Sequence, residues 1–187
     1  MTNDNEPAKT ATSQAEPWLR GTLPEVPAVP RAVLHALELA QEDLQRWCHS
    51  LTDTELQASP AGLPALAFHL RHIARSVDRL LTYVEGRALS SHQLAELKAE
   101  SHPGANRDEL FAELTTSLAN ARERVLALTT ANFESPRIVG KKALPTTLGA
   151  LLVHIAEHTQ RHVGQAVTTA KLLISLRDRQ ASSRDTP

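Results

Sequence analysis

The sequence predicts an all-α fold, a single four-helix bundle with short extra helices. Apolar residues recur at spacings of three and four over four long stretches of the 187-residue chain, which is the pattern of amphipathic helices. The chain has only seven glycines and 3% aromatic residues, whereas a many-stranded β-fold needs more turn residues and more strand-forming side chains. Its 41% of hydrophobic residues are enough to build one buried core.

The four long helices are expected at residues 31–50, 64–85, 106–128 and 147–176. Pro30 suits the first turn of the first helix, and Gly86 stands where a glycine commonly ends a helix. Asn106, with a glutamate three positions later, forms a capping-box pattern at the start of the third helix. Thr146 or Thr147 is expected to cap the fourth.

Shorter elements are expected between the long helices. A second capping-box pattern begins at Thr52 and predicts a short helix that ends at the Ser-Pro-Ala-Gly run of residues 59–62. Residues 90–100 predict another short helix. The proline- and glycine-containing segment 130–145 is expected to be an irregular loop with a small hairpin at 137–143.

The chain is expected to form one domain, residues 17–177, between two polar tails. Residues 1–16 predict a disordered N-terminal tail, because they offer little apolar surface to bury, and residues 178–187 predict a polar C-terminal tail. No run approaches 18 apolar residues, so no membrane-spanning helix is expected. The lone cysteine, Cys48, cannot form an internal disulfide, which favours the reducing cytoplasm.

The charge pattern argues against nucleic-acid binding. Lys and Arg total 20 against 21 Asp and Glu, so the chain has no overall basic field. Arg71, Arg75 and Arg79 form a basic stripe on the second long helix, interleaved with Asp78. Such a stripe is typically a solvated helix face, and we expect one here.

The nine histidines are the unusual feature of the composition. His158 and His162 are four residues apart, so both project from one helix face about 6 Å apart. The helical wheel places His162 within the apolar arc and His158 about 20° beyond its edge. It places His154 about 60° outside the arc, at the boundary with solvent. An apolar core offers few hydrogen-bond partners for two imidazoles, whereas one metal ion binds the acceptor nitrogens of both rings. The spacing therefore predicts a metal site, without the glutamate of the zincin motif.

A third ligand is expected from the second long helix, which carries His69 and His72. The wheel favours His69, about 60° from the centre of the apolar stripe, over His72 at about 120°. However, Ala65, Phe68 and Tyr83 flank His72, so its side of the helix can face a cleft or a neighbouring helix. The residue pattern leaves both histidines open as the third ligand.

Both histidine segments resemble those of the DinB-like metal-binding proteins, a superfamily that includes thiol-dependent transferases and isomerases. The resemblance rests on the run from His69 to Leu81 and on the run from His154 to Gln165, where His-x-x-x-His is followed by x-Gly-Gln. It covers about residues 30–176. It implies an up-down-down-up four-helix bundle, commonly dimeric, with a divalent metal ion held by three histidines.

Carried onto this chain, the resemblance makes His72, His158 and His162 the metal ligands, because the family histidine precedes an apolar residue and an alanine, as His72 does. Zinc and nickel both suit imidazole ligands. Val163 stands where the family often has an arginine, so a cation is missing there. Gln165 projects within about 20° of His158 on the wheel and is a candidate partner of the ligands.

Three histidines leave one position open on a tetrahedral ion, which is the catalytic pattern. The resemblance implies that a low-molecular-weight thiol binds there as a thiolate and attacks an electrophilic substrate. The expected function is a cytoplasmic, homodimeric, metal-dependent transferase or isomerase. The alternative is a non-catalytic, metal-stabilised bundle that acts through oligomerisation or in a stress response. The sequence identifies no general base and no substrate-binding group.

Overall fold

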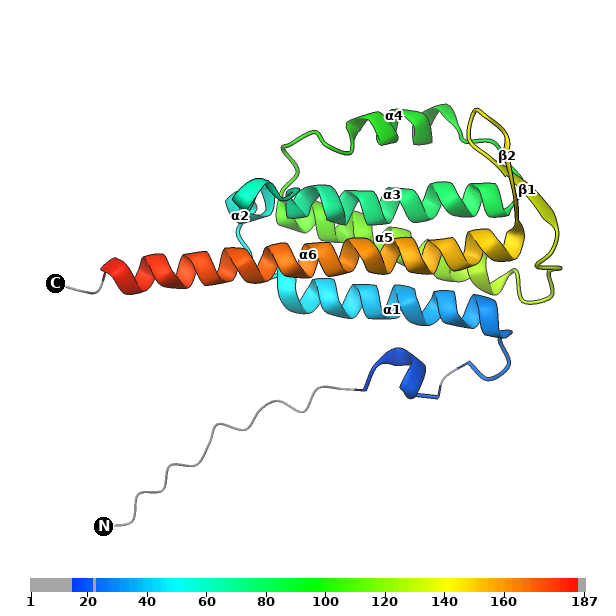
Figure 1. The fold of residues 1–187 in the computed structure, drawn as a ribbon, viewed down its shortest axis with the longest axis horizontal. Coiled ribbons are helices and arrows are strands. Elements are labelled where there is room, and N and C mark those ends of the chain that lie inside the picture. Colours follow the sequence, from blue (N-terminus) through cyan, green and yellow to red (C-terminus); the bar gives the residue numbers. More distant parts are fainter. Residues whose placement is uncertain (1–14, 22, 185–187) are drawn as a thin grey trace, which may run out of the picture.

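The computed structural model describes residues 15–21 and 23–184. Four long helices form a bundle: α1 (Ala28–Cys48), α3 (Leu66–Val84), α5 (Arg107–Leu126) and α6 (Leu148–Arg184). In Figure 1, α1 and α6 run in one direction and α3 and α5 in the other, which confirms the predicted up-down-down-up topology. Residues 1–14 of the predicted disordered tail lie outside the described residues.

The four helices surround one apolar core. Each packs against two neighbours, in the order α1, α6, α3, α5 and back to α1. Side chains of the predicted apolar stripes are fully buried there, among them Leu44, Leu70, Ile73 and Ile155. Because α3 and α6 are neighbours, the histidines of both helices are brought to one interface.

The short elements also follow the sequence signals. They are η1 (Pro17–Leu19), α2 (Asp53–Gln57), η2 (Pro60–Gly62), α4 (Ser91–Ala99), β1 (Pro136–Val139) and β2 (Leu144–Thr147). The expected capping boxes at Thr52 and Asn106 are both formed. Thr147 accepts a hydrogen bond from the backbone N–H of Ala150 at 3.2 Å, which makes it the cap of α6.

The predicted hairpin is present, but it extends beyond the predicted range of 137–143, from Pro136 to Thr147. Strands β1 and β2 pair antiparallel with Pro136 opposite Thr147 and Val139 opposite Leu144. Residues 140–143 form the turn between the two strands. Gly140 has a φ of +70° and Ala143 a φ of +49°, and the glycine adopts this conformation without a steric penalty.

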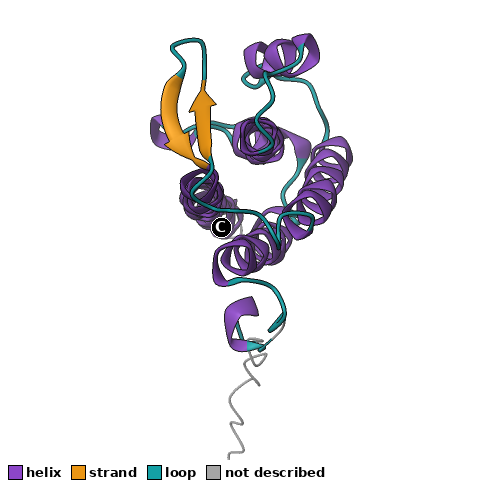
Figure 2. Cartoon of the chain, turned by 90° about the vertical axis from the view of Figure 1, so that its right-hand side faces the viewer, coloured by secondary structure: helices purple, strands orange, loops and turns teal. Residues whose placement is uncertain are grey.

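Helix α4 belongs to the long connection that parallel neighbours α3 and α5 require. It packs on α3, and Figure 2 shows it outside the ring of long helices, on the same side as the hairpin. Gln93 of α4 is buried and donates hydrogen bonds to Asp78 at 2.5 Å and Thr82 at 2.8 Å. These contacts fix α4 on the surface of α3.

The expectation of a solvated basic stripe on α3 was wrong. Arg71 and Arg79 are each only 8% exposed, because the connection that contains α4 covers this face of the helix. Arg71 donates to the backbone carbonyl of His102, and Arg75 donates to Glu113 at 2.5 Å. The sequence did not reveal that a later segment folds back over these arginines.

Helix α6 is longer than predicted. It continues past residue 176 through most of the predicted polar tail, to Arg184, and Figure 1 shows its last turns projecting beyond the other helices. Residues 177–183 are exposed, and no Gly or Pro interrupts them, so nothing in the sequence stops the helix there. No helix among the described residues combines the length and apolarity needed to cross a membrane.

The core prediction uses two neighbouring residues of α6. Leu152 is fully buried, whereas Val153 is 53% exposed. Leu152→Ala should lower the free energy of unfolding by about 2–5 kcal/mol, because it removes buried methyl groups and leaves a cavity. Val153→Ala should change it by less than about 0.5 kcal/mol. Urea denaturation of the two variants measures both values, and equal losses would contradict the assigned core.

Candidate metal centre

Three histidines converge where α3 packs against α6. One ring nitrogen from each of His72, His158 and His162 lies within 4.8 Å of the other two. The Nε2 atoms of His72 and His158 are 2.9 Å apart, and the ring centroids of His72 and His162 are 4.3 Å apart. All three side chains are partly buried. The structure thus brings together the three histidines that the resemblance selected.

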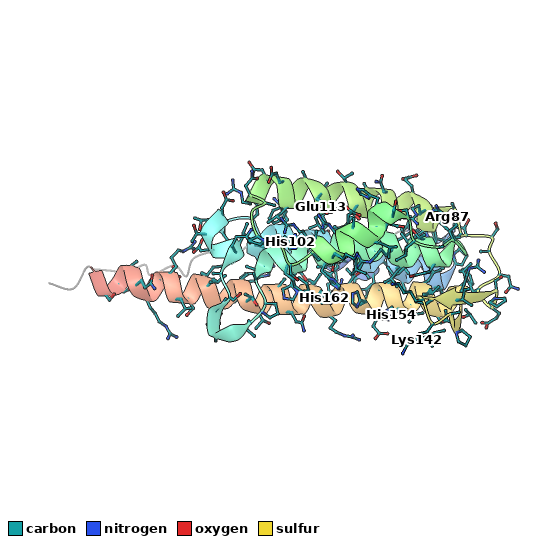
Figure 3. The ribbon with its side chains drawn as sticks, turned by 90° about the horizontal axis from the view of Figure 1, so that it is seen from above. Arg87, His102, Glu113, Lys142, His154 and His162 are labelled. Atoms are coloured by element: carbon teal, nitrogen blue, oxygen red, sulfur yellow. The ribbon has the colours of Figure 1, made fainter. Side chains whose placement is uncertain are left out.

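Helical spacing on α6 explains how two of these side chains reach the same point. His158 and His162 are one turn apart, and their ring centroids are separated by 4.6 Å. Figure 3 shows His154 and His162 following one another along α6. The His154 ring lies 5.4 Å from that of His158, and His154 is not part of the three-histidine group. This matches its expected position at the rim.

A buried carboxylate contacts the second ring nitrogen of His72, Nδ1. Glu100, only 5% exposed, lies 2.8 Å through Oε2 from His72 Nδ1 and accepts a hydrogen bond from Arg79 through Oε1 at 2.5 Å. Burial opposes ionisation of Glu100, but the hydrogen bonds from His72 and Arg79 outweigh it and keep its pKa below the ordinary value. An ionised Glu100 places the His72 proton on Nδ1 and leaves Nε2 free as a ligand.

His69, the other histidine of α3 at this interface, contacts His162 of the three-histidine group. It is 1% exposed, and its Nδ1 lies 3.1 Å from Nδ1 of His162. Its Nε2 is buried and has no hydrogen-bond partner in the described part of the chain. The wheel therefore identified the more deeply buried histidine of α3, but that histidine adjoins His162 and is not part of the three-histidine group.

Phe68 covers one side of the centre. Its ring stacks on His72 with centroids 5.2 Å apart and an interplanar angle of 19°, and it meets His162 edge-on at 6.3 Å. By contrast, Gln165 is exposed and makes no hydrogen bond to the histidines that the structure describes. The described hydrogen bonds therefore give no support to Gln165 as a partner of the ligands.

The imidazoles of His158 and His162, and of the neighbouring His69, are held neutral at pH 7. Burial, followed by the proximity of the other histidines, lowers the pKa of His158 and of His162 to about 4. Burial and His72 lower the pKa of His69 to about 4 as well. Neutral imidazoles have a free lone pair at neutral pH, which is what a metal ion requires. The donor set therefore fits a divalent ion that prefers nitrogen ligands.

The remaining titratable candidates lie apart from this centre. Histidines 35, 49, 92 and 102 are not part of the three-histidine group. Cys48 is fully buried, and desolvation raises its pKa to about 12, so it is a packing residue and not a thiolate nucleophile. Sequence reasoning missed Glu100 and Arg79 as parts of the site, whereas it placed Phe68 beside His72. No motif marks Glu100, since its role depends on how α4 folds back onto α3.

Comparisons with known proteins agree with this architecture. A family model described as the DinB superfamily matches residues 36–166. The solved structure of YfiT from Bacillus subtilis superposes with a TM-score of 0.56 at 18% sequence identity, and covers 77% of this chain and 87% of YfiT. YfiT is described as a probable metal-dependent hydrolase with an unusual four-helix bundle topology. A search of curated protein sequences gives no match.

The lowered pKa values predict how stability depends on pH. His158, His162 and His69 have pKa values of about 4 in the fold, against 6.5 for a free histidine. Between these values the unfolded chain binds protons that the folded chain does not. The metal-free protein should therefore be most stable above pH 6.5 and lose stability as the pH falls towards 4.

Thermal unfolding of chelator-treated protein between pH 7.5 and 4 measures this dependence. The double variant H158Q/H162Q is the control, because glutamine does not titrate, and its melting temperature should fall less over the same range. An equal fall in both proteins would show that these histidines do not cause the loss.

Proposed function

Because the chain belongs to the DinB superfamily, we propose that it is a metal-dependent enzyme in which His72, His158 and His162 hold one divalent ion, zinc or nickel. We further propose that it transfers a low-molecular-weight thiol to an electrophilic substrate. The observation that carries the proposal is the convergence of three ring nitrogens within 4.8 Å of one another. Two of these rings have their second nitrogen already in contact with another side chain.

The surrounding contacts support the choice of ligand atoms. Glu100 lies against Nδ1 of His72, and His69 lies against Nδ1 of His162. Both rings are therefore left with Nε2 for an ion, and His158 already directs Nε2 towards His72. A histidine that ligates through one nitrogen and hydrogen-bonds through the other is the usual arrangement in metal proteins. The Glu100 carboxylate also offsets part of an ion's positive charge.

An open coordination position supports catalysis over a purely structural role. A divalent ion held by three imidazoles keeps a place for a small nucleophile and lowers the pKa of a thiol or water bound there. Phe68 shields one side of the histidines and limits the approach of bulk water. The superfamily's thiol-dependent members support a thiol as the nucleophile. The likeness to YfiT favours water, and so hydrolysis is the second candidate.

Single substitutions test the ligand set. His158→Ala, His162→Ala and His72→Ala should each abolish stoichiometric zinc binding, because two imidazoles hold the ion much more weakly than three. His154→Ala, the control at the rim, should keep one zinc per chain. Metal analysis after dialysis against a fixed free zinc concentration measures the stoichiometry. Loss of zinc in His69→Ala together with its retention in His72→Ala would make His69 the ligand instead.

Glu100 should affect metal affinity without touching the ion. Glu100→Gln removes the charge that holds the His72 proton on Nδ1, and it should weaken zinc binding about 10–100-fold. The matched control is Glu113→Gln, which removes a carboxylate that pairs with Arg75 on α3 and, among the described residues, has no hydrogen bond to the histidines. Competition titration with a chromogenic chelator measures both affinities. Equal effects of the two variants would argue against the role of Glu100.

Activity separates the candidate functions. The zinc- or nickel-loaded protein should accelerate conjugation of an electrophile such as 1-chloro-2,4-dinitrobenzene with one of a panel of cellular thiols, and His158→Ala should remove that rate. Hydrolysis of activated esters or amides without a thiol would favour the second candidate. Tight metal binding with neither activity would favour the non-catalytic, metal-stabilised bundle.

A further inference from the structure

A cavity of about 500 Å³ lies between the N-terminal segment and helices α1 and α6. Pro17 and Trp18 of η1 form one wall, residues of α1 form another, and Gln160 of α6 completes the lining. Figure 1 shows η1 beside α1, on the side of the bundle opposite α4. The volume is in the range of small-molecule sites. Among the described residues, the lining shares none with the three-histidine group.

Polar contacts hold both sides of this cavity in place. Arg20, which follows η1, pairs with Glu38 and with Glu42 of α1 at 2.6 Å each, and so fixes the N-terminal segment on α1. On the other side, the Gln160 side-chain amide donates to the backbone carbonyl of Ala36 at 2.7 Å, which ties α6 to α1. Because the chain's own contacts fix both walls, the cavity is preformed for a ligand.

Most of the lining is apolar, and Trp18 supplies its aromatic part. The Trp18 side chain is 61% exposed, and its indole N–H already donates to Glu16 at 2.8 Å. The polar edge of the indole is therefore satisfied, and its apolar surface is what it offers to a ligand. An aromatic ring in the cavity can stack on the indole and lose contact with water. The wall from α1 has small or aliphatic side chains, Ala28, Ala32, Ala36 and Leu39, which leave room for a flat ring.

Arg31 gives the cavity its charge. None of the described residues that line the cavity is an Asp or a Glu. The Arg31 side chain makes no hydrogen bond or ion pair within the described part of the chain, whereas Arg20 is paired with two glutamates. A planar guanidinium without a carboxylate partner favours a carboxylate ligand, which it binds through two parallel hydrogen bonds. The other polar side chains of the lining, His35 and Gln160, carry no negative charge that would repel such a ligand.

We propose that this cavity binds a planar aromatic acid. Its carboxylate pairs with Arg31, and its ring lies between Trp18 and the alanines of α1. The inference goes beyond the proposed function and does not depend on it, because no described residue of the cavity belongs to the three-histidine group. The chain thus has a second binding site, for an organic anion, on the side of the bundle formed by α1.

The test uses sodium 2-naphthoate as the probe and ¹⁵N-labelled full-length protein. The chain has two tryptophans, so its ¹H–¹⁵N spectrum contains two indole N–H signals, and Trp47→Phe identifies which one belongs to Trp18. Naphthoate should shift the Trp18 signal in a saturable manner and leave the Trp47 signal unchanged. Isothermal titration calorimetry measures the affinity, which should be the same for chelator-treated and zinc-loaded protein.

Two analogues of the probe separate the contributions of charge and ring. The neutral analogue 2-naphthamide should bind about tenfold more weakly, because hydrogen bonds between a guanidinium and a charged acceptor are the stronger ones. Decahydronaphthalene-2-carboxylate keeps the charge but not the aromatic ring, and it should bind about two- to tenfold more weakly, since it cannot stack on the indole. Equal affinities for all three compounds would show a cavity that accepts any apolar body, and would overturn the inference.

Variants assign these contributions to residues. Arg31→Gln should weaken naphthoate binding about tenfold or more, whereas Arg122→Gln, which changes an exposed arginine of α5 outside the cavity, should leave it unchanged. Trp18→Leu should remove the preference for naphthoate over its saturated analogue but keep the preference for the acid over the amide. Neither Arg31 nor Trp18 is a core residue, so both variants should fold. Naphthoate binding that tolerates Arg31→Gln overturns the inference.

Other occupants have different signatures. Naphthoate that binds only to the zinc-loaded protein and leaves Trp18 unshifted has bound the ion, which overturns the inference. A Trp18 signal that responds to protein concentration and not to naphthoate makes a second copy of the chain the occupant, with the same consequence. Failure of the proposed function is distinct, because a protein that binds no zinc or nickel would contradict the metal centre and should still bind naphthoate beside Trp18.

Discussion

The packing of α3 against α6 sets the main constraint on this protein, because it buries imidazole rings where ordinary partners are absent. Helical backbone groups are already paired with one another, and the surrounding core side chains are apolar. The ring nitrogens must therefore be satisfied by each other, by a carboxylate or by an ion. The 2.9 Å and 3.1 Å contacts between histidines of the two helices are the consequence. The neutral state of His158 and His162 follows from the same burial.

The bundle topology brings a carboxylate to one of these imidazoles. Since α3 and α5 run in parallel, the chain between them must return along the bundle, and α4 lies on that return path. Glu100 follows directly after α4 and reaches His72 and Arg79 on α3. The connection thus has two roles. It makes the up-down-down-up order possible, and it delivers the carboxylate that orients His72.

Sequence reasoning predicted the parts of this arrangement that depend on a single helix. The long helices follow from apolar spacing and from caps such as Asn106, and the pairing of His158 with His162 follows from their spacing of four. The contribution of Glu100 and the burial of Arg71 and Arg79 depend on which segment covers α3, and no local pattern encodes that. The length of α6 was missed for the opposite reason. An exposed polar helix and a polar tail have the same composition.

The difference between His69 and His72 shows why burial alone does not select a metal ligand. A helical wheel measures how far a side chain faces the core, and by that measure His69 is correctly the deeper residue. A ligand must instead combine a free nitrogen near the other donors with a second nitrogen held by a proton acceptor. His72 meets both conditions, because Glu100 is ionised and borders its Nδ1. His69 has only another neutral imidazole beside it. His69 therefore acts as a hydrogen-bonding partner of His162, whereas His72 is the proposed ligand. Both histidines of α3 thus contribute to the same centre, the buried one through His162 and the less buried one directly.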